Sequence, residues 1–220
     1  MQSRYLTYIG GFFVAVLLIS NTVSTKIVSF GSLAFDGGTL LFPLAYIFGD
    51  ILTEVYGYRQ TRKIIWLGFA CLFLMSVVYI AVGMLPPHDS WGYQTDYEHI
   101  LGIAPRIALA SLVAYFAGEF SNSYILAKIK ILTKGKNLWL RTISSTLVGQ
   151  GVDTILFIGI AFYGIFQLEV LFALAISNYI FKVAVEVLFT PLTYLIVGFL
   201  KKKEKMDVYD KNINFSPFRL

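Results

Sequence analysis

Two carboxylates in an otherwise apolar stretch are the residues whose types and spacing most clearly suggest chemistry. The stretch from Phe42 to Tyr58 reads FPLAYIFGDILTEVYGY and contains Asp50 and Glu54. Residues four apart lie one turn above one another on a helix, so these acids can converge on one ligand or one counter-ion. Acids in membrane spans almost always face the bundle interior or a water-filled path, which makes this face a candidate site. The alternative is that Glu54 lies at the membrane interface and only Asp50 is buried.

Other apolar segments carry polar pairs with helical spacing. Glu119 and Asn122 are three apart in GEFSNSY, and Gln150 and Asp153 are three apart in GQGVDT. Each pair therefore shares one helix face. The amides of Asn122 and Gln150 can contact a ligand, or they can simply bridge neighbouring helices.

A third polar stripe is formed by Asn178, Lys182 and Glu186, which repeat every four residues in NYIFKVAVE. Lys182 could pair with Glu186 one turn away, or with Asp50 or Asp153 across helices, and any of these pairs lowers the cost of burying the charges. The spacing alone does not choose among these partners. The predicted substrate-binding residues are Asn21, Asp50, Glu54, Glu119, Asn122, Gln150, Asp153, Asn178, Lys182 and Glu186.

Composition predicts the elements that must position these side chains. The chain has 220 residues, of which 57% are hydrophobic and only 14% charged, which is typical of an all-α integral membrane protein. About 20 apolar residues are needed for each span. We predict one transmembrane domain over residues 1–220, with spans at about 5–24, 39–56, 64–85, 106–128, 138–163 and 169–199. Pro105 opens the fourth span, and the long sixth span should tilt, or kink at Pro191.

Lys and Arg are unevenly distributed between alternate connections. One set of connections contains most of them, namely Arg59, Arg62, Lys63, Lys128, Lys130, Lys134, Lys136, Arg141 and the segment KKKEK after the last span. The other set contains Lys26 and Arg106 but is otherwise acidic. The positive-inside rule therefore places both termini and the basic loops in the cytoplasm. The net charge of +5 is explained by this topology and by anionic lipid, without nucleic acid.

The chain lacks the sequence motifs of several enzyme classes. Cys71 is the single cysteine, and both histidines, His88 and His99, fall in one predicted outer loop. The chain has no P-loop, no G-x-S-x-G and no H-E-x-x-H segment. We therefore expect no enzyme activity, no catalytic residues, no metal and no cofactor.

Five segments resemble a known family. They are NTVSTK, FPLAYIFGDILTEVYGYR, GEFSNSYILAKIK, LWLRTISSTLVGQGVDT and FKVAVEVLFTPLTY, which lie between Asn21 and Tyr194. The chain is similar here to the queuosine precursor transporters, also described as vitamin-uptake-transporter-like proteins. The resemblance implies a bacterial inner-membrane importer of 7-cyano-7-deazaguanine and 7-aminomethyl-7-deazaguanine for salvage into tRNA modification. It also implies a six-helix bundle resembling the substrate-binding subunits of energy-coupling-factor transporters.

The candidate residues suit such a ligand. Carboxylates accept the adjacent N–H donors of a guanine-like edge, while amide or ammonium groups donate to its carbonyl. Phe42, Tyr46 or Tyr179 could cover the ring face.

The mode of transport has several alternatives. We favour a solitary carrier, facilitated or ion-coupled, over a subunit that needs an energising ATPase module. Gly11 and Ala15 are four apart on the first span, but the A-x-x-x-A pattern used for docking such a partner is missing. An acid-lined ion channel is the alternative from a different class. Membrane lipid, the small-molecule substrate and a homo-oligomer are the other expected partners.

Overall fold

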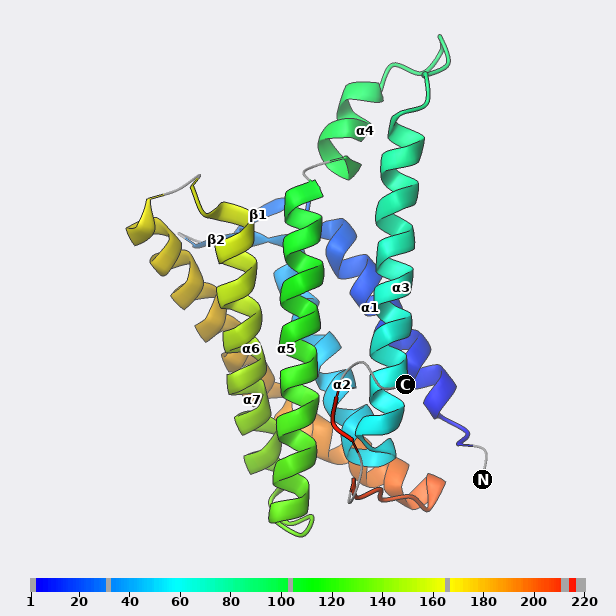
Figure 1. The fold of residues 1–220 in the computed structure, drawn as a ribbon, viewed down its shortest axis with the longest axis vertical. Helices are drawn as coiled ribbons and strands as arrows, with labels where there is room; N and C mark the ends of the chain where they lie inside the picture. Colours follow the sequence, from blue (N-terminus) through cyan, green and yellow to red (C-terminus); the bar gives the residue numbers. More distant parts are fainter. Residues whose placement is uncertain (1–2, 31–32, 103–104, 165–166, 211–213, 217–220) are drawn as a thin grey trace.

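The computed structural model describes residues 3–30, 33–102, 105–164, 167–210 and 214–216. Within these ranges the chain forms seven α-helices and one β-hairpin (Figure 1). The helices are α1 (Leu6–Val23), α2 (Phe42–Tyr56), α3 (Tyr58–Gly83), α4 (Gln94–Leu101), α5 (Pro105–Leu132), α6 (Leu138–Phe162) and α7 (Leu168–Glu204). Strands β1 (Ile27–Phe30) and β2 (Leu33–Asp36) pair antiparallel, with Ile27 opposite Asp36, and the 3-10 helix η1 (Gly37–Leu40) leads into α2.

The all-helical class is confirmed, and six of the seven helices overlap the six predicted spans. Four of them, α1, α3, α6 and α7, are long and apolar enough to cross a membrane. Crossing by α2 and α5 stays a prediction, because neither is among these four. The sequence reading missed the hairpin and also α4, which lies in the segment predicted as an outer loop.

Helix α2 lies at the centre of the bundle. It spans fifteen residues, about 22 Å at 1.5 Å per residue, which is shorter than a hydrocarbon core of about 30 Å. Twelve of its fifteen residues are buried, including both Asp50 and Glu54. The helix ends at Gly57, whose φ of 82° is a left-handed conformation that favours glycine, and α3 begins at the next residue. Protein therefore surrounds α2 on nearly every side.

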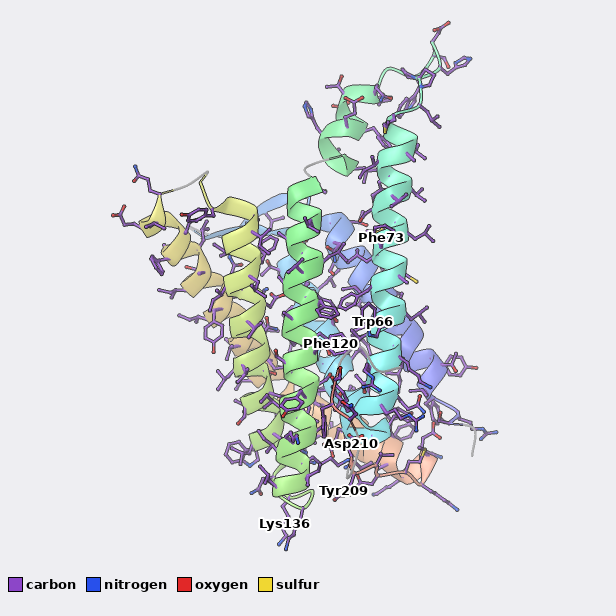
Figure 2. All side chains as sticks on the ribbon, in the orientation of Figure 1. Trp66, Phe73, Phe120, Lys136, Tyr209 and Asp210 are labelled. Carbon is purple, nitrogen blue, oxygen red and sulfur yellow. The ribbon has the colours of Figure 1, made fainter. Side chains whose placement is uncertain are left out.

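The outer faces of the longer helices have the opposite character. Large apolar side chains such as Phe73 on α3, Ile155 on α6 and Leu188 on α7 are exposed, whereas many polar side chains are buried. Figure 2 shows Phe73 on α3, at the outside of the bundle. This inversion of the water-soluble pattern indicates that lipid, not water, contacts these faces.

The two ends of the bundle differ in charge. The start of α1, the turn at Gly57, the α5–α6 loop and the end of α7 lie at one end, which we call the basic end (Figure 1). Lys136, Tyr209 and Asp210 mark this end in Figure 2. The hairpin, α4 and the start of α7 lie at the opposite end, which carries Asp96 and Glu98 in α4 and Glu169 in α7.

The long helix α7 runs obliquely across the bundle from the end that carries α4 to the basic end (Figure 1). It spans 37 residues and remains helical through Pro191. The oblique path agrees with the tilt expected for a span longer than the membrane is thick.

Helices α5 and α6 pack closely through two glycines. A Cβ atom on Gly118 would lie 2.9 Å from the Gly149 carbonyl oxygen, and one on Gly149 would lie 2.7 Å from Asn122 Cβ. The same two sites contact Tyr46 of α2. Small residues at this crossing therefore bring the polar faces of α2, α5 and α6 together.

We expect Gly149→Ala to lower the free energy of unfolding by about 1 to 3 kcal/mol, because the added methyl group overpacks this crossing. Gly159→Ala on the same helix is the matched control. Nothing lies within 4 Å of its added Cβ, so alanine there should be neutral or slightly stabilising. Thermal unfolding of the purified proteins measures both, and equal stabilities would contradict the close-packing argument.

Candidate functional site

A charge cluster at the basic end surrounds the carboxylate of Glu54. Arg141 of α6 donates from Nε to Oε2 at 2.6 Å and from Nη2 to Oε1 at 2.7 Å, which makes a two-pronged ion pair. Lys201 of α7 donates to Oε1 at 2.5 Å, and Lys130 of α5 lies 3.6 Å from the same oxygen. Asp207, beyond α7, contacts Lys130 at 2.7 Å and Lys201 at 3.0 Å. Three cations and two carboxylates thus meet where α2, α5 and α7 end and α6 begins.

Glu54 is therefore engaged by cations at both carboxylate oxygens, although the sequence suggested it as a ligand contact. Burying this acid without a partner would be very costly, and Arg141 supplies a bidentate one. From the sequence, Arg141 and Lys130 were interpreted only as basic residues that set the membrane orientation. Their basic character was visible, but their distance from Glu54 in the chain concealed the pairing.

A second group of buried polar residues lies deeper in the bundle, and we call it the polar core. Its members come from α2, α5, α6 and α7, and they are Asp50, Glu119, Asn122, Gln150, Asp153, Lys182 and Glu186. Seven of the ten predicted site residues are in this set. Four are essentially inaccessible, and none is more than 8% exposed.

Hydrogen bonds and electrostatic interactions connect the members of the polar core. Asn122 donates from Nδ2 to Asp50 Oδ1 at 2.7 Å. The Glu119 carboxylate lies against Gly49, the neighbour of Asp50, where a Cβ atom would clash with it. Asp50 interacts electrostatically with Glu186 and Glu119, and Glu119 interacts with Glu186. Three carboxyl groups from three helices therefore lie close together.

Lys182 forms its ion pair with Asp153, at 2.7 Å, and not with the other two acids considered from sequence. Its Nζ also lies 4.6 Å from the centre of the Phe42 ring, at the start of α2. Phe42 contacts Tyr115 edge-on at 5.3 Å, and Tyr46 is part of the same aromatic group. Tyr115 was not among the aromatic residues predicted to cover a ligand.

Several polar atoms of the core have no hydrogen-bond partner among the described residues. They are Asp50 Oδ2, Glu119 Oε2, Asn122 Oδ1, both side-chain amide atoms of Gln150 and both carboxyl oxygens of Glu186. Leaving such atoms unpaired away from water costs about 1 to 3 kcal/mol each, more for charged groups. The set offers both acceptors and one amide donor, which is what a flat heterocycle with mixed N–H and carbonyl edges requires.

The remaining predicted residues and one aromatic candidate bond elsewhere. The amides of Asn21 and Asn178 donate to Leu17 and Leu174 in their own helices. Tyr179 donates its hydroxyl to the Leu147 carbonyl of α6. These side chains are half-buried, and they donate to backbone carbonyl groups of helices rather than to members of the polar core.

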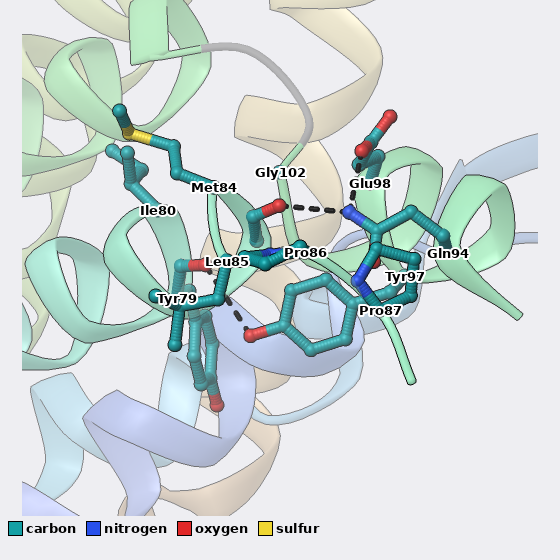
Figure 3. Close-up of a pocket in the computed structure, with 11 residues that line it drawn as sticks. Tyr79, Ile80, Met84, Leu85, Pro86, Pro87, Gln94, Tyr97, Glu98 and Gly102 are labelled. Carbon is teal, nitrogen blue, oxygen red and sulfur yellow. Dashed lines mark hydrogen bonds between the residues drawn. The ribbon is translucent and has the colours of Figure 1, made fainter. Parts of the chain in front are cut away.

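A hollow of about 530 Å³ lies away from the polar core, between the end of α3 and α4 (Figure 3). Inside it Gln94 donates to the Gly83 carbonyl at 2.8 Å, and Tyr97 donates to the Tyr79 carbonyl at 3.3 Å. These bonds hold α4 against α3. The donors of Gln94 and Tyr97 are thus satisfied within the protein.

Among the described residues, no three His, Cys, Asp or Glu side chains are grouped so that they could hold a metal ion. The exposed apolar faces and the buried polar core together define a multi-pass helical membrane protein with a polar interior.

The comparisons with known proteins name its family. A family described as "Putative vitamin uptake transporter" matches residues 36–196, and the chain belongs to it. The predicted family is thus confirmed, and with it the expectation of a transporter rather than an enzyme.

Three relatives cover most of the chain. A "Probable queuosine precursor transporter" of Bacillus subtilis is 34% identical over 80% of this chain and 77% of its own length. A protein of the same name from Haemophilus influenzae is 25% identical over 96% of this chain and 94% of its own. The "Queuosine precursor transporter" of Escherichia coli is 26% identical over 91% and 90%. No solved structure matches the chain.

Substitutions in the Asp153–Lys182 pair can decide whether Asp153 has a structural or a ligand-binding role. Asp153→Asn strands a buried cation, so we expect a loss of about 3 to 5 kcal/mol in stability and much less folded protein in the membrane. Adding Lys182→Met removes the stranded charge and should restore folding. Quantifying folded protein for the single and double variants measures this. Intact folding of Asp153→Asn, with only ligand binding lost, would instead assign Asp153 to the ligand.

Proposed function

We propose that this chain is a carrier that imports queuosine precursors, with the polar core as its binding site. The observation that carries the proposal is the set of unpartnered, buried polar atoms contributed by four helices. Such groups are expensive in a membrane protein and are generally kept for function. The names of the three relatives supply the substrate class.

The proposed substrates are 7-cyano-7-deazaguanine and 7-aminomethyl-7-deazaguanine. Both present a guanine edge with adjacent N–H donors, which Asp50 or Glu186 can accept through free carboxyl oxygens. The Gln150 amide can donate to the ring carbonyl and accept a ring N–H. Phe42, Tyr46 and Tyr115 lie beside Lys182 or Asp153 and are suited to cover a ring face.

The two precursors differ in charge, and the polar core contains groups that can accommodate each of them. The aminomethyl compound is a cation at neutral pH, whereas the nitrile is neutral. Asp50, Glu119 and Glu186 have no cationic side chain paired with them among the described residues, so one of these acids can balance an ammonium group. Recognition common to both ligands must then come from the guanine edge and the ring.

We place the protein in the bacterial inner membrane as a single six-span domain with both termini cytoplasmic. The concentration of Lys and Arg at the basic end supports this orientation. The six helices α1, α2, α3, α5, α6 and α7 are compatible with the bundle of energy-coupling-factor binding subunits that the resemblance implies.

We favour transport by the chain alone, with an energising ATPase partner as the alternative. Gly11 and Ala15 are exposed on α1, so the small-residue face is accessible, but such a face alone identifies no partner. Uptake of labelled 7-cyano-7-deazaguanine by cells that make only this protein separates the modes. Saturable uptake, with competition by guanine analogues, is expected. Ion currents without saturable uptake would indicate a channel.

Glu186→Gln tests the binding site with little change of volume. Neither carboxyl oxygen has a partner in the described chain, so folding should be retained. A mismatched amide against a ligand donor should weaken substrate binding by about ten- to a hundredfold. Concentration-dependent uptake and the amount of folded protein are measured together. Glu169→Gln, an exposed position on the same helix, is the control, and equal uptake by both variants would remove Glu186 from the site.

Cysteine labelling tests the orientation. In a Cys71→Ala background, a membrane-impermeant thiol probe outside the cell should label Ser90→Cys but not Lys136→Cys. Both positions are exposed, whereas a side chain at Gly135 would meet Tyr209 and be strained at φ 76°. The reverse labelling pattern would overturn the orientation.

A further inference from the structure

The chain beyond α7 folds back across the basic end of the bundle. We call its described residues, 206–210 and 214–216, the C-terminal strap. Val208 donates its backbone N–H to the Val55 carbonyl at 3.4 Å, and Asp210 accepts the Tyr58 N–H at 2.8 Å. A Cβ atom on Gly57 would lie 2.7 Å from Val208 Cγ1, so only glycine lets the strap approach this closely. The strap thus covers the turn between α2 and α3.

The second part of the strap is held by α3 and α5. Arg62 of α3 donates from Nη1 to the carbonyl oxygens of Asn214 and Ser216, at 3.1 and 2.5 Å. Tyr58 donates its hydroxyl to the Phe215 carbonyl at 3.0 Å. The Phe215 ring packs on Tyr58 and on Tyr124, with centroids 5.3 and 5.2 Å apart. Arg62 and the rings of Tyr58 and Tyr124 therefore hold this part of the strap, and Lys128 Nζ lies 4.3 Å from the centre of the Phe215 ring.

The strap also completes the charge cluster. Without Asp207, the charges of Lys130, Arg141 and Lys201 would face Glu54 alone. Burial tends to raise the pKa of Asp207, but hydrogen bonds from Lys130 and Lys201 and their charges hold that pKa below its ordinary value of 3.8. Asp207 is therefore ionised at neutral pH and balances one of the cations.

A line of buried hydroxyl groups connects the strap region with the polar core. Thr61 donates to the Gly57 carbonyl, under the strap, at 3.1 Å. Thr53 Oγ1 lies 3.2 Å from both Thr61 Oγ1 and Ser123 Oγ, and Ser123 donates to Glu119 Oε1 at 3.4 Å. All three hydroxyl residues are fully buried. We call Thr61, Thr53 and Ser123 the hydroxyl track.

We propose that the C-terminal strap is a latch over the hydroxyl track, and that its release admits water to the polar core and lets substrate leave the core at the basic end. The proposal rests on the proposed function for the identity of the substrate, but not for the opening itself. The strap is held largely by hydrogen bonds and ion pairs to groups at the basic end of the bundle. Water can replace these bonds when the strap is released. The helix α2 links latch and site, because Glu54 lies one turn from Asp50.

The test measures how accessible the track is, without any transport. Ser123→Cys, in the Cys71→Ala background, places a near-isosteric thiol at the inner end of the track, beside Glu119. In purified protein, a charged water-soluble methanethiosulfonate reagent should modify this thiol slowly. Arg62→Ala or Asp207→Asn should each accelerate modification by about tenfold or more, since each removes charge-assisted bonds to the strap. Arg59→Ala is the matched control, because Arg59 is on the same helix and its side chain is exposed.

Modification rates that stay at the parental value in folded Arg62→Ala and Asp207→Asn would overturn the latch. An equal acceleration by Arg59→Ala would overturn it as well, because it would indicate general loosening of α3.

A second experiment locks the strap in place instead of releasing it. Tyr124→Cys and Phe215→Cys, joined by a bis-maleimide, hold the strap in place, and uptake should fall at least about tenfold relative to Phe215→Cys treated alone. Parental uptake by the linked protein would refute the latch. If the parent shows no deazaguanine uptake while Ser123→Cys still responds to strap variants, the proposed substrate is wrong and the latch stands.

Discussion

The ion pair between Glu54 and Arg141 is the interaction on which the arrangement of this bundle depends. Helix α2 is too short to span a membrane comfortably and is enclosed by protein, so it must be positioned by specific contacts. Glu54 provides them, because its two oxygens bind Arg141 of α6 and Lys201 of α7, and its carbonyl oxygen binds Lys130 of α5. In a low-dielectric interior, each of these charges is tolerable only while the others are present. Stability and geometry at the basic end are therefore coupled.

Asp50 and Glu54 are one helical turn apart, yet their surroundings differ. Glu54 is saturated by cations, whereas Asp50 has one amide donor and one oxygen without a partner. The difference arises because the basic residues of α5, α6 and α7 lie at one end of the bundle, while the middle of α7 offers only Lys182, already paired with Asp153. A carboxylate in the middle of the bundle can therefore recognise a ligand, and one at the end holds helices together.

Close helix contacts make the polar core compact enough to surround a small ligand. Gly118 and Gly149 allow α5 and α6 to approach, and the same contact brings Tyr46 and Asp153 beside each other. A carrier needs such a site to be reached from each side in turn, so the contacts at its ends must be releasable. Hydrogen bonds and ion pairs at the basic end meet that requirement better than a large apolar seam, because water can compensate them when they open.

The sequence by itself determined the all-helical membrane class, the family, the approximate helix boundaries and all seven members of the polar core. The family follows from the resemblance of whole segments, whereas the class, the boundaries and the polar positions follow from local properties, namely runs of apolar residues, prolines such as Pro105, and polar residues at helical spacing. Only the tertiary structure decided the partners. It chose Asp153 for Lys182, joined Glu54 to Arg141 across 87 positions of the chain, and placed the strap over Gly57. The hairpin and α4 were also missed, because short elements at the ends of a bundle are stabilised by docking contacts such as Gln94 to Gly83, and not by hydrophobic periodicity.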